Sequence, residues 1–250
     1  MNLSLGHAVV AETVKLRTLP AALVTVAVTV AGTAGLAALL AVAARDTAGA
    51  ETVPALHTAL QTVGYTQVGF VLLGVLTITT EYSGGQIHAS LAGVPRRMVL
   101  LSGKTAALLG AALPTAAAAV AVAVAAVQLV LGERAQPLGE QFAEVGVRPL
   151  AGAVAYLVLV GLFGYAVAVP ARSPVTALVV LLPVLLLVPP LLDAVTDHAE
   201  YLPSPAGAQM YQPGPVPDGA LGPLLGGAVM AGWTVAAFAV AAAVFHRRDA

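Results

Sequence analysis

The chain has 250 residues, of which 59% are hydrophobic and only 9% charged, and its mean hydropathy is +0.92. A soluble domain carries about 25% charged residues, so this sequence has too little polar surface to solvate a globule, and a lipid bilayer is the expected solvent. The absence of cysteine excludes disulfides, iron–sulfur clusters and thiolate metal sites. Long unbroken apolar runs replace the alternating pattern of a membrane β-barrel, so the sequence predicts helices.

Six of these runs are long enough to span a bilayer, because about 20 helical residues cross a hydrocarbon core of roughly 30 Å. We therefore predict an all-α polytopic membrane protein with one transmembrane domain over residues 1–250. The predicted transmembrane helices are 19–44, 61–80, 105–131, 149–169, 175–192 and 224–245. Residues 1–18 are predicted to form an interfacial helix, and residues 193–223 an extracytoplasmic loop.

Two local features qualify this pattern. Ala41-Val42-Ala43 is similar to a signal-peptidase site, but the apolar run before it exceeds the usual h-region of about 7–15 residues, which favours a retained span. Pro183, Pro189 and Pro190 lie inside the fifth run and predict a kink or break in its second half.

The distribution of basic residues predicts the orientation. Lys15, Arg17, Arg96, Arg97, Lys104, Arg172, Arg247 and Arg248 fall on one side of a six-span topology. Only Arg45, Arg134 and Arg148 fall on the other side, together with most of the acids. Because basic loops stay in the cytoplasm, we expect both termini and the 81–104 segment to be cytoplasmic, in a multi-pass protein of a bacterial cytoplasmic membrane.

The segment from Glu81 to Lys104 carries the most information. Gly84 and Gly85 permit a sharp turn after the second span. Ile87 and Leu91, followed by Val94, recur at helical spacing and predict a short amphipathic helix that ends before Arg96 and Arg97. Such a helix either docks on a cytoplasmic partner or lies on anionic lipid, held by the arginines and Lys104.

This segment resembles the cytoplasmic loop between the second and third helices of ABC type-2 permeases of the actinobacterial type. The matching residues are Glu81, Gly85-Gln86-Ile87, Leu91-Ala92-Gly93-Val94-Pro95-Arg96-Arg97 and Lys104, although Gln86 stands where Thr or Ser is more usual. Tyr201-Leu202-Pro203-Ser204-Pro205-Ala206-Gly207 is similar to the stretch before the last helix of these permeases, and the start containing Glu12, Lys15 and Arg17 is similar to theirs.

The resemblance implies a permease subunit of an ATP-driven exporter, working as a dimer with a second copy or a homologous permease. A coupling helix between helices 2 and 3 would contact a separate ABC ATPase subunit. The coupling residues would be Glu81, Gly84, Gly85, Ile87, Leu91, Arg96, Arg97 and Lys104. ATP and magnesium would bind the partner ATPase, so no cofactor is expected on this chain. Membrane lipid is a further expected partner, and nucleic acid is not.

Polar residues within the spans are candidates for lining the translocation path, namely Gln61, Tyr65, Gln67 and Gln128. The alternative is that they make hydrogen bonds between helices. No charged residue is placed in the middle of a span, which argues against an ion-coupled secondary transporter. That class and a non-transporting immunity or sensor protein remain alternatives.

The chain is not predicted to be an enzyme. Gly103-Lys104-Thr105 lacks the upstream glycine of a phosphate loop, because Met98 occupies that position. Asp193, Asp197 and His198 are near one another in the sequence, but a solvated loop explains them better than a metal site, and none is predicted.

Overall fold

The computed structural model describes residues 5–48, 51–83, 97–214, 216 and 221–247. These residues form an all-helical structure with six helices long and apolar enough to cross a membrane. The candidate spans are Pro20–Thr47, Ala55–Tyr82, Met98–Arg134, Arg148–Ala171, Pro174–Asp193 and Pro223–Val244. Each contains or closely overlaps one of the six predicted runs. The coupling helix was predicted around residues 81–97, of which 84–96 lie outside the described residues.

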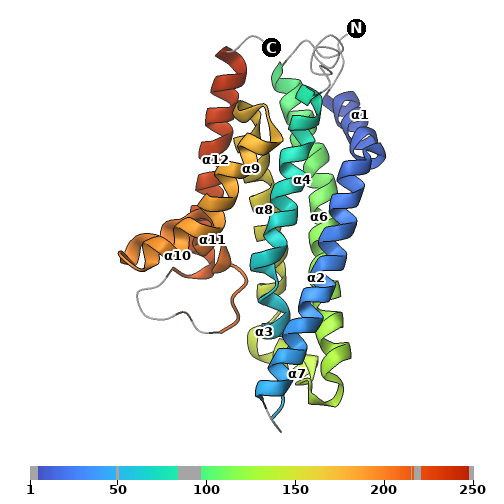
Figure 1. Ribbon diagram of the computed structural model, residues 1–250, viewed down its shortest axis with the longest axis vertical. Helices are drawn as coiled ribbons and strands as arrows, with labels where there is room; N and C mark the ends of the chain where they lie inside the picture. Colours follow the sequence, from blue (N-terminus) through green and yellow to red (C-terminus); the bar gives the residue numbers. More distant parts are fainter. Residues whose placement is uncertain (1–4, 49–50, 84–96, 215, 217–220, 248–250) are drawn as a thin grey trace.

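The elements follow one another along the chain, with the labels of Figure 1, as α1 (Leu5–Thr18), α2 (Pro20–Thr47), α3 (Ala55–Leu60), α4 (Val63–Ser83), α6 (Arg97–Leu131), a 3₁₀ turn η1 (Gly132–Arg134), α7 (Leu138–Val145), α8 (Arg148–Ala171), α9 (Pro174–Leu182), a π-helical turn η2 (Pro183–Leu187), α10 (Val188–Asp193), a 3₁₀ turn η3 (Asp197–Tyr201), α11 (Pro203–Ala208) and α12 (Pro223–Arg247). Helix α1, the end of α4, the start of α6 and the end of α12 lie at one end of the molecule (Figure 1). We call this the basic end, because most of the described Lys and Arg residues belong to these parts of the helices. Helices α3 and α7 lie at the opposite end, which we call the far end.

Helices α4 and α8 form the centre of the bundle. In the spans that contain them, 67% of the most apolar window is buried, against 17% for α2 and 17% for α12. Close contact requires glycine here, since a Cβ on Gly74 would lie 2.0 Å from the carbonyl oxygen of Gly161. Because only 17% of the most apolar window of α2 is buried, most of the surface of this helix is left for lipid or a partner.

The predicted break in the fifth span occurs at Pro183, where the helix passes into the π-helical turn η2, and α10 then projects sideways from the bundle (Figure 1). Pro189 has no N–H to donate to the carbonyl of Leu185, four residues earlier. The hydroxyl of Ser204 donates to that carbonyl instead, at 2.6 Å. The freed backbone group thus ties the bent helix to the following segment.

The 193–223 region, predicted only as a loop, contains η3 and α11 and packs back onto the bundle. The Tyr211 ring lies 5.4 Å from that of Tyr156 on α8, centroid to centroid. A Cβ on Gly152 of α8 would meet the carbonyl oxygen of Met210 at 1.9 Å. Burial raises the pKa of Tyr211 to about 12, because the phenolate would be poorly solvated there.

Helix α6 begins at Arg97, before the predicted third span at 105–131. The sequence suggested a polar connection from Glu81 to Lys104. The helix continues through Ser102 and Lys104 because Ser102 donates to its own backbone at Met98, and Lys104 is neutralised by carboxylates from other helices.

Candidate functional site: a buried ionic network

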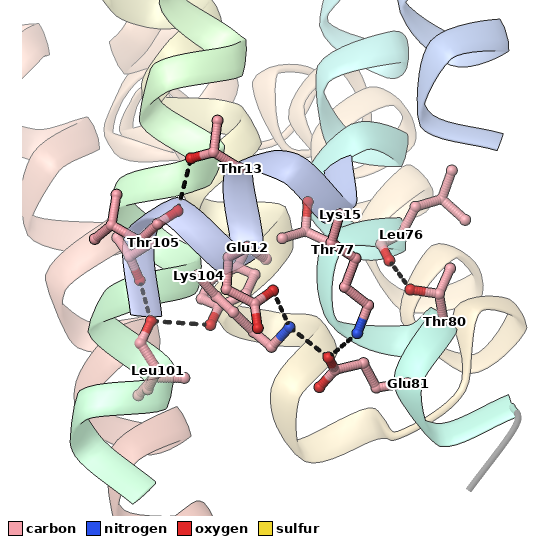
Figure 2. A network of polar contacts seen from close by, with 12 residues as sticks. Glu12, Thr13, Lys15, Leu76, Thr77, Thr80, Glu81, Leu101, Lys104 and Thr105 are labelled. Atoms are coloured by element: carbon pink, nitrogen blue, oxygen red, sulfur yellow. Dashed lines mark hydrogen bonds and ion pairs between the residues drawn. The ribbon is translucent and has the colours of Figure 1, made fainter. Parts of the chain in front are cut away.

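Four charged side chains meet where α1, α4 and α6 converge at the basic end (Figure 2). The ammonium of Lys104 on α6 lies 2.6 Å from Oε2 of Glu12 on α1 and 2.7 Å from Oε1 of Glu81 on α4. Lys15 of α1 also donates to Oε1 of Glu81. One carboxylate of α4 is thus shared by cations from two helices.

The burial of this network is unusual for charged groups. The side chains of Glu81 and Lys104 are 0% and 1% exposed, that of Glu12 is 10% exposed, and that of Lys15 is 32% exposed. Two acids and two bases balance, so the network as a whole carries no net charge when all four are ionised. That balance is what makes burial tolerable, because an unpaired charge in the same place would lose its hydration without compensation.

The local sequence explains how α1 reaches this position. Ala8, Glu12 and Leu16 are four residues apart and all buried, so they form the face of α1 that packs on the bundle. Gly103 allows the approach, since even a Cβ there would come within 3.1 Å of the Ala8 Cβ. Lys104 follows Gly103 directly, which places its ammonium beside Glu12.

Helix α8 reaches the same region through Tyr165. This side chain is fully buried, and its hydroxyl donates to the backbone carbonyl of Leu101 at 3.3 Å. Beside the network, the guanidinium of Arg172, which follows α8, lies 5.6 Å from the centroid of the Tyr82 ring. Both contacts link α8 to the residues that neighbour Glu81 and Lys104.

The structure brings two of the predicted coupling residues, Glu81 and Lys104, into direct contact. Both are buried, so they act within the chain, and a surface contact with another protein would have to be made by their neighbours. Arg97 begins α6, and its side chain is outside the described part of the chain. The remaining predicted coupling residues also lie outside it: Gly84, Gly85, Ile87, Leu91 and Arg96.

Sequence reasoning gave Glu12 and Lys15 no role in a site. Both entered through the resemblance of the N-terminal segment, and Lys15 also through the distribution of basic residues that predicts the orientation. The available signal was the placement of Glu12 between Ala8 and Leu16 on the apolar side of an amphipathic helix. An acid on that side requires a cation from another element.

The four polar residues proposed to line a path lie in three different environments. Gln61 and Tyr65 are exposed and line a cavity of about 480 Å³ near the far end. Gln67 is buried, with Oε1 accepting from the Tyr156 hydroxyl and Nε2 donating to the Gly64 carbonyl at 2.6 Å. Its environment fits a hydrogen bond between helices. The Nε2 of Gln128 is buried and has no hydrogen-bond partner among the described residues.

Comparison of the chain with protein-family models and with curated proteins finds no match. Within the described ranges, no group of three or more His, Asp or Glu side chains is arranged to hold a metal ion. Interpretation of the site therefore depends on its geometry and on the resemblance carried by the sequence.

Proposed function

We propose that this chain is the permease subunit of an ATP-driven ABC exporter, which forms the translocation path as a dimer and couples to a separate ATPase subunit. Three observations support the proposal. They are the six membrane-length helices, the ordered resemblance of the 81–104 and 201–207 segments to ABC type-2 permeases, and the buried ionic network.

The network is the observation that carries most weight. Glu81 and Lys104 bracket residues 84–96, the predicted coupling helix, and both are bonded to α1. A force applied to that segment by a partner would therefore move α1, α4 and α6 together. Because packed elements shift between discrete arrangements and do not deform continuously, such a connection transmits motion into the membrane helices.

The surroundings of Lys104 support an energy source on a separate chain. Lys104 belongs to the only sequence stretch that is similar to a phosphate loop, but its ammonium is buried and already bonded to two carboxylates. A nucleotide phosphate would have to displace both acids to reach it. ATP hydrolysis on a partner chain is consistent with this arrangement.

The experiment is co-purification of the tagged chain from its native membrane, followed by identification of bound Walker-type ATPases. We expect an ATPase with the wild type and its loss when residues 84–94 are deleted or when Leu91→Asp places a charge on the predicted coupling helix. Val216→Asp is the matched control, because Val216 is a partly exposed apolar residue remote in sequence from that helix. Equal ATPase recovery from all variants would refute the coupling assignment.

One observation favours a second candidate, an ion-coupled secondary transporter. The candidate spans include Glu81 and Lys104, and buried ionisable groups are what such a carrier requires. Because Glu81 and Lys104 neutralise each other, a structural role that holds the helices together is favoured over a role in ion transport. Uptake or release driven by a proton or sodium gradient in vesicles that contain only this chain, without ATP, would support the carrier and contradict the exporter.

A further inference from the structure

Three hollows lie along one side of the molecule and share lining residues. A cavity of about 310 Å³ lies between α3, α7 and the 213–214 turn, and the cavity of about 480 Å³ lies between α2, α3, α4 and residues 211–213. A groove of about 360 Å³ runs between α2 and α4. His57 and Pro213 line both cavities, and Tyr65 lines the larger cavity and the groove. The three hollows are thus neighbours, and we call the series of hollows from the far end into the membrane-spanning region the path.

The groove is mainly apolar, although threonines contribute to its wall. Val24, Val28 and Leu72 are among its lining residues. The hydroxyls of Thr29 and Thr33 each donate to the backbone carbonyl four residues earlier on α2, so these donors are already used. The groove therefore offers a ligand mainly apolar contact.

The far end of the path is polar. Gln61, Gln212 and His57 line the larger cavity, and His57 and Glu144 line the smaller one. Mostly apolar walls with a few polar groups at one end are the usual character of a site for a small amphipathic molecule.

Glu144 is the acidic residue among the described residues that line these two cavities. Helix α7 is fixed to α3 by Gln141, whose Oε1 accepts from the backbone N–H of Leu56 at 2.8 Å. Glu144 lies three residues further along α7 and so shares the face of Gln141. No Lys or Arg is among the described residues that line either cavity. Arg148, outside both linings, donates to the Gln212 carbonyl at 3.1 Å.

We propose that this path binds a long-chain amphiphile with a cationic amine headgroup, with the amine beside Glu144 and His57 and the chain in the groove between α2 and α4. The groove is lined from Val24 to Leu36 of α2, a length of about 18 Å at the helical rise, which suits an extended alkyl chain. Binding requires only this chain, whereas its interpretation as the exported cargo rests on the proposed function.

The experiment uses the purified full chain in phosphatidylcholine nanodiscs, without an ATPase. The probe is a long-chain primary amine with a diazirine in its alkyl chain, and the matched control is the diazirine fatty acid of the same length. We expect saturable labelling of α2 and α4 peptides by the amine, competed by the unlabelled amine. Labelling by the amine should exceed that by the acid about fivefold, and Glu144→Gln should remove this difference.

Two glycine variants test the groove itself. Gly32 lines the groove, and a Cβ there would meet nothing within 4 Å, so Gly32→Leu fills the groove without a clash at the backbone. Gly110 on α6 is equally open and lies outside the groove, so Gly110→Leu is the matched control. We expect labelling to fall about fivefold or more in the first variant only.

Equal labelling by amine and acid, or undiminished labelling of Gly32→Leu, would overturn the proposal. ATPase co-purification with Glu144→Gln is expected to match that of the wild type. Its loss would count against the proposed function and leave the binding result standing.

Discussion

Replacement of Lys104 by methionine tests whether the ionic network holds the basic end together. Methionine keeps the length and approximate volume of the side chain, so the packing around it is largely retained. What is lost is an ammonium that is 1% exposed and lies 2.6 Å and 2.7 Å from the carboxylates of Glu12 and Glu81. The variant leaves two buried acids, of which Glu81 keeps its ion pair with Lys15 and Glu12 loses its ion pair with Lys104.

The expected loss in the free energy of unfolding is about 3–5 kcal/mol, the usual cost of removing one partner from a buried ion pair. Lys15→Met should cost less, about 1 kcal/mol, because Lys15 is 32% exposed and Glu81 keeps Lys104. The double variant Lys104→Met/Glu12→Gln restores charge balance and should recover about 1–3 kcal/mol relative to Lys104→Met alone.

These free energies can be measured by reversible unfolding of the detergent-solubilised chain with increasing SDS. A loss below about 1 kcal/mol for Lys104→Met, typical of an exposed ion pair, would refute the reasoning. Strict additivity in the double variant would also contradict it, because the argument depends on Lys104 and Glu12 acting on each other.

Three further predictions concern packing and burial elsewhere. Gly74→Val should destabilise the chain in the same SDS assay, whereas Gly35→Val, at a position with open space, should not. Equal stability of the two variants would contradict the close approach of α4 and α8. Ser204→Ala should leave the Leu185 carbonyl without its donor and lower the free energy of unfolding by about 1–3 kcal/mol. Amide hydrogen exchange should become faster after the bend in the fifth span, and unchanged exchange would count against the link between Ser204 and Leu185. Because burial raises the pKa of Tyr211 to about 12, its neutral phenol stabilises the fold fully below pH 10, and this contribution is lost as the pH rises through 12. Tyr211→Phe should therefore flatten the decline in unfolding free energy between pH 10 and 12, and an unchanged decline would contradict the burial.

The spans could be predicted because their physical cause is local. A run of residues that is long and apolar enough to cross a bilayer must form its backbone hydrogen bonds within its own helix, whatever surrounds it. The kink at Pro183 is local in the same sense. Where the chain goes after the bend was not predictable, because it depends on Ser204, which is remote in sequence and meets the Leu185 carbonyl only in the folded chain.

The candidate site was only half predicted for a similar reason. Glu81 and Lys104 were singled out as the two ends of the polar 81–104 segment, and the third span was predicted to begin after Lys104. The burial of Lys104 becomes reasonable only when Glu12 is brought in from α1, 92 positions away. Likewise, Gln67 was predicted to line a path, because the sequence does not show that the Tyr156 hydroxyl donates a hydrogen bond to its side chain.

The most direct test of the central claim, that residues 84–96 couple this chain to a separate ATPase, is site-specific photocrosslinking in the native membrane. A photoreactive amino acid would replace Leu91 in one variant and Glu140, exposed on α7 at the far end, in another. We predict a crosslink from position 91 to a Walker-type ATPase and none from position 140. A crosslink to that ATPase from position 140, or none from position 91, would contradict the account.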